Sequence, residues 1–86
     1  MRSEPEKTVE NARLGRLLRQ TRKAKGISQV HLAGLLGQPQ SFVSKVERGE
    51  RRLELVEFVE LVNLIQGDPR EVFGLFLDGG GWDDED

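Results

Sequence analysis

The segment QVHLAGLLGQPQSFVSKVER, residues 29–48, decides the fold of this chain. Ser28 stands just before it, and serine is one of the residues that best cap the start of a helix. Gly37 divides the segment in two, and glycine is the residue that most easily adopts the positive φ of a tight turn. The sequence therefore predicts two short helices, residues 29–36 and about 39–48, that meet at Gly37.

Each of these two predicted helices has an apolar side and a polar side. Leu32 and Leu36 share one face of the first helix, and Val43 and Val46 share one face of the second. Ala33 is small enough to let the two helices pack closely, as in a helix-turn-helix. The outer face of the second helix consists of Gln40, Ser41, Ser44, Lys45 and Arg48. This face is rich in hydrogen-bond donors and has no carboxylate, so it suits the major groove of DNA.

The remaining segments also show helical spacing of apolar residues. Nowhere do apolar and polar residues alternate for long enough to predict a strand. Further helices are expected over residues 8–25, with Thr8 as the cap, over about 55–65, closed by Gly67, and over 69–77. The sequence thus predicts an all-α fold, a compact bundle of five helices.

The length of 86 residues allows one small domain. We expect this domain over residues 9–78, with the helix-turn-helix at about 28–49. A flexible arm is expected over residues 1–8, and a flexible, Gly-rich, acidic tail over residues 79–86.

Composition argues against an enzyme. The chain has no cysteine and no tyrosine, and its one histidine, His31, cannot form a metal site alone. No group of acid, base and nucleophile converges in the pattern, so we expect no catalytic residue, no metal, no cofactor and no small-molecule ligand. No apolar run approaches the roughly 20 residues of a membrane span, so no membrane contact is expected and a cytoplasmic protein is predicted.

Charge is divided unequally along the chain. Residues 1–52 carry 12 Lys and Arg against 5 Asp and Glu, a balance of +7, whereas residues 53–86 carry 1 against 10, a balance of −9. This asymmetry predicts a half that faces a polyanion and a half that is kept away from it. The cations of the first predicted helix, taken alone, are typical of a solvated face with at most one or two phosphate contacts: Arg13, Arg16, Arg19, Arg22, Lys23 and Lys25.

Several stretches, taken in order, resemble the Cro/C1-type helix-turn-helix, also called the XRE family. They are RLGRLLRQTR at 13–22, GISQ at 26–29, Leu32-Ala33, Gly37 and SFVSKVERG at 41–49. The resemblance covers about residues 14–76. It implies a lambda-repressor-like, five-helix DNA-binding domain, often dimeric and typically a transcriptional repressor or autoregulator.

The resemblance also implies roles for individual residues. The positions that read bases correspond to Gln40, Ser41 and Lys45, with Ser44 beside them. The positions that contact the DNA backbone correspond to Gln29, Gln38, Arg48, Arg51 and Arg52, of which Gln29 also braces the recognition helix. Arg22 and Glu47 match a pair that links the first and third helices. Gln38 and Pro39 depart from the family pattern, in which a buried aliphatic residue and a Ser or Thr cap are common.

The last predicted helix carries more apolar surface than one small core can absorb. We expect Phe73, Phe76 and Leu77 to meet a second copy of the chain, because helix-turn-helix dimers match half-sites about 34 Å apart. The favoured function is a sequence-specific regulator, a repressor or autoregulator, that binds double-stranded DNA with a pseudo-palindromic operator as a homodimer. The alternative is an antitoxin or small adaptor whose main role is to hold a protein partner on DNA.

Overall fold

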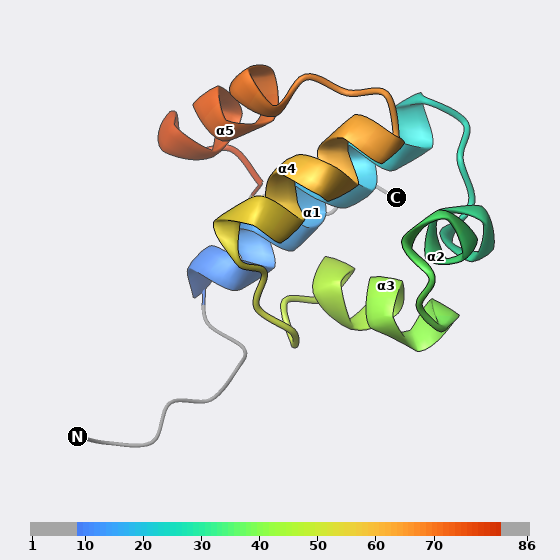
Figure 1. Cartoon of the computed structure of the whole chain (residues 1–86). Helices are drawn as coiled ribbons and strands as arrows, with labels where there is room; N and C mark the ends of the chain where they lie inside the picture. The colour runs from blue at the N-terminus through green and yellow to red at the C-terminus, as the bar shows by residue number, and fades with distance from the viewer. Residues whose placement is uncertain (1–8, 82–86) are drawn as a thin grey trace.

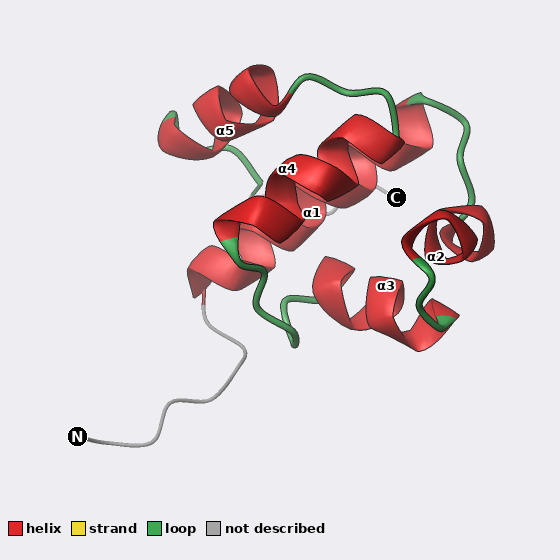
Figure 2. Cartoon of the chain, viewed as in Figure 1, coloured by secondary structure: helices red, strands yellow, loops and turns green. Residues whose placement is uncertain are grey.

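The computed structural model describes residues 9–81, and over this range the chain forms five helices and no strand (Figures 1 and 2). The helices are α1 (Val9–Ala24), α2 (Gln29–Leu36), α3 (Gln40–Glu47), α4 (Leu55–Leu64) and α5 (Pro69–Leu77). The predicted all-α, five-helix fold is therefore confirmed. Within the same range, no helix has the length and apolar character needed to cross a membrane.

Local signals define the helix-turn-helix. The Ser28 hydroxyl oxygen accepts a hydrogen bond from the backbone N–H of His31 at 3.0 Å, so Ser28 caps α2 as predicted. Gly37 ends α2 with φ of +69°, and the N–H of Gln38 donates to the Ala33 carbonyl at 2.9 Å. Pro39 precedes α3 in an extended conformation and provides no side-chain cap.

The core takes residues from all five helices. Its fully buried members are Leu18 of α1, Leu32 of α2, Val43 of α3 and Val62 of α4, together with Ile65 just after α4, and Val72 of α5 completes it. Helix α2 packs against α3 and α4, whereas α1 packs against α3 and α5. In Figure 1, α2 and α3 consequently lie at one side of the molecule and α5 at the opposite side.

Two glycines let α1 approach the end of α3. A Cβ atom on Gly15 would lie 2.5 Å from the carbonyl oxygen of Glu47, closer than real Cβ atoms come to backbone. Gly49 follows α3 with φ of +77°, and its Cβ would lie 2.7 Å from Cα of Ala12. The position of α3 on the scaffold therefore depends on the absence of two side chains.

The end of α4 differs from the prediction. The left-handed residue there is Gln66, with φ of +62°, and not Gly67. Gly67 donates its N–H to the Val62 carbonyl at 2.9 Å, and its missing side chain makes room for the methyl groups of Val62 and Thr21. Gly67 thus serves tertiary packing, while Gln66 takes the unfavourable backbone conformation.

The end of the described chain, Gly80 and Gly81, packs against α1. Arg13 donates from Nε to the Gly80 carbonyl at 2.9 Å and from Nη2 to the Phe76 carbonyl, and Arg16 donates to the Gly81 carbonyl at 3.1 Å. The Arg13 guanidinium also lies 4.5 Å above the Phe76 ring. Residues 80 and 81, at the start of the expected tail, thus lie against α1. The expected arm, residues 1–8, and residues 82–86 of the expected tail lie outside the described residues.

The prediction of a solvated arginine face on α1 is wrong for Arg13, while Arg22 is buried in the pair with Glu47 that the family resemblance implies. Arg13 and Arg22 are only 8% and 7% exposed. Arg13 is buried against α5, and Arg22 is buried between α1 and α3. Both side chains bind partners that are remote in the sequence, so a local pattern of charges could not distinguish them from their exposed neighbours Lys23 and Lys25.

Candidate nucleic-acid interface

The outer face of α3 is polar and free of carboxylates. Gln40, Ser41, Lys45 and Arg48 are exposed, and Ser44 is half-buried. On the opposite side, Val43 and Val46 are buried in the core. Glu47 is the only acidic residue of α3, and it is 6% exposed, so it does not contribute to the outer face.

A chain of hydrogen bonds connects this face to the interior. Arg22 donates from Nε to Oε2 of Glu47 at 2.6 Å and from Nη2 to Oε1 at 3.0 Å. Gln29 donates from Nε2 to Oε1 of Glu47 at 2.9 Å, and Gln40 donates from Nε2 to Oε1 of Gln29 at 3.1 Å. The expected link between Arg22 and Glu47 is confirmed, and Gln29 joins α2 to α3 through Glu47 and Gln40. These hydrogen bonds join α1, α2 and α3, and they reach Gln40, the first residue of α3.

Every nitrogen and oxygen of the buried ion pair in this chain has a hydrogen-bond partner. Arg22 donates from Nη1 to the carbonyl of Ile27 at 2.7 Å, and Glu47 accepts from both Arg22 and Gln29. Within the described residues, no buried side-chain nitrogen or oxygen lacks a partner. A buried pair that is satisfied in this way sets a defined geometry, while losing one partner leaves a buried charge.

The arginines at the end of α3 are paired with carboxylates. Arg48 donates to Glu50 through Nη2 at 3.1 Å and Nε at 3.3 Å, and through Nη1 to the Ser44 hydroxyl at 2.5 Å. The hydrogen bond from Arg48 to Glu50, and the negative charge of Glu50, raise the pKa of Arg48 above its ordinary value. Sequence analysis did not predict that Glu50 binds Arg48, although the two opposite charges lie only two residues apart.

A second pair lies in the loop after α3. Arg51 donates through Nη2 to Glu57 at 3.2 Å, and its guanidinium lies 4.9 Å above the ring of Phe42. Glu57 also accepts from the backbone N–H of Glu54 at 2.9 Å. The bond from Glu54, and then the bond from Arg51, lower the pKa of Glu57.

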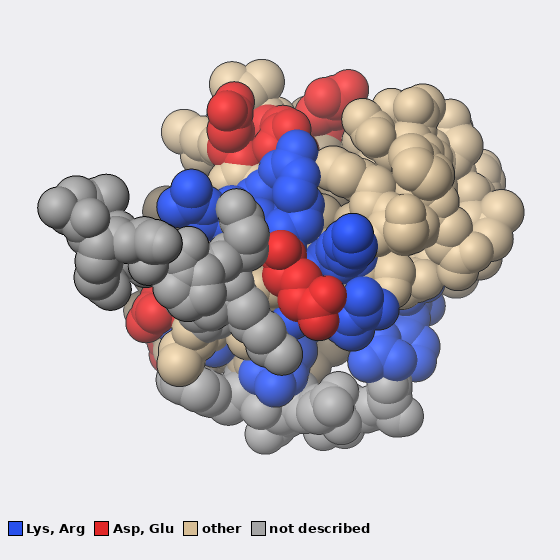
Figure 3. All heavy atoms as spheres, turned by 90° about the horizontal axis from the view of Figure 1, so that it is seen from below, with Lys and Arg blue, Asp and Glu red and all other residues tan. Residues whose placement is uncertain are grey.

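Figure 3 views the molecule from the side of α3. Lys and Arg side chains gather across this face, and acidic side chains lie among them and at one edge. The two other residues predicted to contact the DNA backbone lie in the segments before and after α3. Gln38 is exposed in the turn before α3, and Arg52 is exposed in the loop before α4.

The predicted dimer residues divide into two kinds. Phe73 and Leu77 are 46% and 66% exposed on α5. Phe76 is partly buried, because its ring lies against Arg13 and stacks on Phe73 with centroids 6.4 Å apart. Phe73 in turn meets Phe58 of α4 edge-on, with centroids 6.5 Å apart.

Helix α4 carries exposed apolar residues that sequence analysis did not single out. Leu55 and Val56 are 72% and 75% exposed, and Val59 is also exposed. They line a shallow groove with Glu60, Asn63 and Leu64. The spacing of 55, 56 and 59 is itself helical, but it is offset from the core positions 58, 61 and 62 of the same helix. We call Leu55, Val56 and Val59 the α4 stripe.

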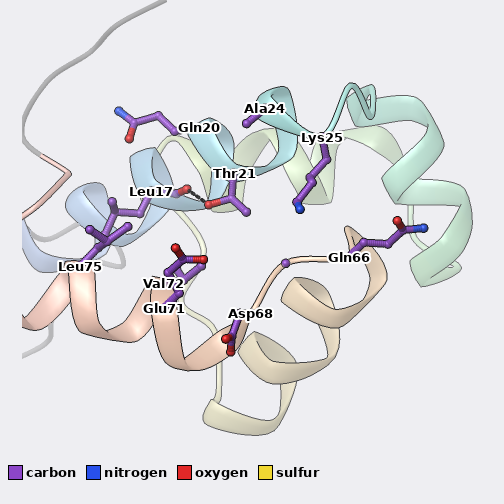
Figure 4. Close-up of a pocket in the computed structure, with 11 residues that line it drawn as sticks. Leu17, Gln20, Thr21, Ala24, Lys25, Gln66, Asp68, Glu71, Val72 and Leu75 are labelled. Carbon is purple, nitrogen blue, oxygen red and sulfur yellow. Dashed lines mark hydrogen bonds between the residues drawn. The ribbon is translucent and has the colours of Figure 1, made fainter.

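A cleft of about 370 Å³ lies between α1 and α5, and no residue of α3 lines it (Figure 4). Leu17 and Leu75 lie at one end, and Lys25 and Gln66 lie toward the other. The Thr21 hydroxyl donates a hydrogen bond to the Leu17 carbonyl at 2.8 Å. Within residues 9–81, no group of three or more His, Cys, Asp or Glu residues is placed to hold a metal ion.

Comparison with known proteins agrees with this geometry. A family described as "Helix-turn-helix domain" matches residues 13–72. The restriction-modification controller protein C.AhdI from Aeromonas hydrophila is 41% identical, with a TM-score of 0.70, over 77% of this chain and 100% of that one. An XRE-family like protein from Pseudomonas syringae is 42% identical, with a TM-score of 0.68, over 81% of this chain and 89% of that one.

A more distant structure shares the fold alone. The clp gene regulator ClgR from Corynebacterium glutamicum is 22% identical, with a TM-score of 0.75, over 86% of this chain and 78% of that one. A comparison with curated proteins found no match. The family match covers most of the chain, and the family consists of regulators, not enzymes. The chain therefore belongs to the XRE-like helix-turn-helix family of DNA-binding transcriptional regulators.

Proposed function

We propose that this chain is a sequence-specific repressor or autoregulator that binds a pseudo-palindromic operator as a homodimer, with α3 in the major groove. The observation that carries the proposal is the outer face of α3, which is exposed, rich in donors and free of carboxylates. The series of hydrogen bonds from Arg22 to Gln40 supports the proposal, because a helix that contacts bases must be held in one orientation.

The base-reading residues in this proposal are Gln40, Ser41 and Lys45, with Ser44 beside them. The amide of Gln40 has two N–H donors and one oxygen, and one N–H is used on Gln29. The other N–H and the oxygen match the N7 acceptor and N6 donor of adenine. Lys45 makes no hydrogen bond or ion pair with any other residue that the structure describes, so its ammonium group is available to O6 and N7 of guanine.

The contacts to the DNA backbone are assigned to Gln29, Gln38, Arg48, Arg51 and Arg52. They flank α3 on both sides: Gln29 at the start of α2, Gln38 in the turn, and the arginines at and after the end of α3. Phosphate contacts on both sides of a recognition helix fix its register without reading sequence.

The dimer interface is assigned to Phe73, Phe76 and Leu77 of α5, joined by the α4 stripe. Phe73 and Leu77 provide the exposed apolar surface, whereas the partly buried Phe76 supports Phe73 by stacking on its ring. Exposed apolar side chains on two neighbouring helices suit an isologous contact between two copies.

The test is a selection of bound duplexes from a random DNA pool, followed by sequencing. We expect an enriched motif with two-fold symmetry and half-sites about 34 Å apart. Lys45→Ala is expected to relax the preference at one position of each half-site, at a cost of about 1–3 kcal/mol on the enriched site. Lys25→Ala removes the same charge beside the α1–α5 cleft and is expected to leave the motif intact. An enriched motif that Lys45→Ala leaves unchanged would contradict the role of Lys45.

The alternative function, an antitoxin or adaptor that holds a protein partner on DNA, is favoured by one observation. The α4 stripe is exposed in the single chain and can receive a different protein as well as a second copy. Light scattering on the purified protein separates the two functions. A dimer that enriches a symmetric motif supports the regulator, whereas a monomer that enriches no motif supports the adaptor.

A further inference from the structure

The cations near α3 are held in two different ways. Lys45 has no partner among residues 9–81. Arg48 and Arg51, by contrast, each place two guanidinium nitrogens on a carboxylate, that of Glu50 and that of Glu57. The base-reading cation of the proposed interface is therefore free, and two of its phosphate-binding cations are occupied.

The two pairs are accessible enough to exchange partners. The side chains of Arg48 and Glu50 are 54% and 39% exposed, and those of Arg51 and Glu57 are 40% and 35% exposed. Exposed pairs of this kind contribute little to stability, about 0–1 kcal/mol each. A phosphate presents the same bidentate acceptor geometry to a guanidinium as a carboxylate does. A DNA phosphate can thus replace Glu50 or Glu57 as the partner of the arginine. The displaced carboxylate then stays close to the phosphate, and the two negative charges repel each other.

We propose that Glu50 and Glu57 limit sequence-independent DNA binding by competing with phosphates for Arg48 and Arg51. The inference rests on the proposed DNA-binding function of this face. Sequence-independent affinity comes almost entirely from phosphate contacts, whereas base contacts add the sequence-dependent part. Glu50 and Glu57 bind the phosphate-binding arginines, whereas no carboxylate among the described residues binds Lys45. The two carboxylates therefore lower the sequence-independent affinity more than the sequence-dependent affinity.

The test compares the parent protein with Glu50→Gln on a random-sequence duplex across a salt series. Glutamine keeps the size of the side chain and removes its charge, so Arg48 becomes available to phosphate. We expect tighter binding at low salt and a slope of log K against log salt that is steeper by about 0.9, the value of one added phosphate contact. Between about 50 and 200 mM salt, the affinity of the variant should fall about 3- to 4-fold more than that of the parent.

Two further variants separate competition from general repulsion. Glu71→Gln removes the same charge on α5, which does not pack against α3, and should leave the slope unchanged. In an Arg48→Ala background, Glu50→Gln should no longer steepen the slope, because the cation that it releases is missing. Glu57→Gln should act like Glu50→Gln, through Arg51. Thermal melts of each variant confirm that it is folded.

The outcomes distinguish this inference from the proposed function. If the parent protein neither binds the random-sequence duplex at low salt nor enriches a motif in the selection, both are overturned. If the parent binds and Glu50→Gln changes neither affinity nor slope, only the competition is overturned. A slope that Glu50→Gln steepens equally in the parent and in the Arg48→Ala background also overturns it, because repulsion then acts without the arginine.

Discussion

Arg22 and Glu47 carry opposite charges in the interior of a very small protein. Each is less than 10% exposed, and two hydrogen bonds join the two side chains. Replacing such a pair as a whole is often neutral, while removing one partner leaves an uncompensated buried charge.

We predict that Arg22→Leu lowers the free energy of unfolding by about 3–5 kcal/mol, because Glu47 is left buried and unpaired. The double variant Arg22→Leu with Glu47→Leu should recover most of this loss. Urea denaturation followed by circular dichroism measures both. Losses that simply add in the double variant would contradict the account.

Gln66 and Gly67 are neighbours with opposite requirements. The left-handed backbone conformation at Gln66 costs a residue with a side chain about 1–2 kcal/mol. Gln66→Gly removes this cost at an entropic cost of about 0.5–1 kcal/mol, so a net gain of about 0.5–1 kcal/mol in stability is expected. Gly67→Ala should destabilise, because its Cβ would lie 3.0 Å from a methyl group of Val62. Thermal unfolding compares the two, and a shift of both in the same direction would contradict the assignment.

At the scale of elements, α5 is held by a side chain from α1. Arg13 donates to the Phe76 carbonyl near the end of α5 and to Gly80 beyond it. Orphan carbonyls at the end of a helix need partners, and here a distant guanidinium supplies them.

We predict that Arg13→Ala loosens α5 more than any other helix, and that it costs about 2 kcal/mol of stability, typical of a lost charged hydrogen bond. Hydrogen exchange should show faster exchange of the α5 amides while those of α2 and α3 stay protected. Lys25→Ala, just after the same helix but exposed, is the control. Uniformly faster exchange across all helices would argue against a local role.

The start of α4 depends on an ionised carboxylate. The hydrogen bond from the Glu54 N–H, and then that from Arg51, lower the pKa of Glu57 below its ordinary value of 4.5 in the folded chain. The stabilisation is therefore complete above about pH 4.5 and is lost as pH falls through the lower folded-state pKa. Glu57→Gln should flatten the dependence of stability on pH in this acid range. Urea midpoints between neutral and acid pH measure it, with Glu71→Gln as the control.

The elements that sequence predicts well are those with local signals. Ser28 and Gly37 act within a few residues of themselves, and so does Asp68, whose carboxylate accepts from the Arg70 N–H at 2.9 Å at the start of α5. The predicted bounds of α2 and α5 match the observed ones. The roles of Arg13 and of Gly80 could not be predicted, because their contact spans 67 residues of sequence. The α4 stripe could not be predicted, because three-dimensional packing decides which side of an apolar helix is covered.

At the scale of the whole molecule, apolar and basic surfaces lie on different helices. The outer face of α3 is polar, whereas α4 and α5 expose leucine, valine and phenylalanine. This division leaves one surface for DNA and another for assembly, as the proposed homodimer requires.

We predict that Val56→Asp converts the proposed dimer to a monomer, because a charge would be buried in the contact. Light scattering measures the mass. Val30→Asp, the same change on the exposed side of α2, should leave the mass unchanged. A dimer that survives Val56→Asp would remove the α4 stripe from the interface.

The hydrogen bond from Gln40 to Gln29 has a consequence for how this protein can acquire new targets. Ser41 and Lys45 can be exchanged one at a time, since neither supports another helix. Gln40 cannot, because each replacement also alters what Gln29, and behind it Glu47, has to bind. Libraries that randomise the α3 face should therefore yield new binding specificities at 41 and 45 independently, but at 40 mainly together with changes at 29.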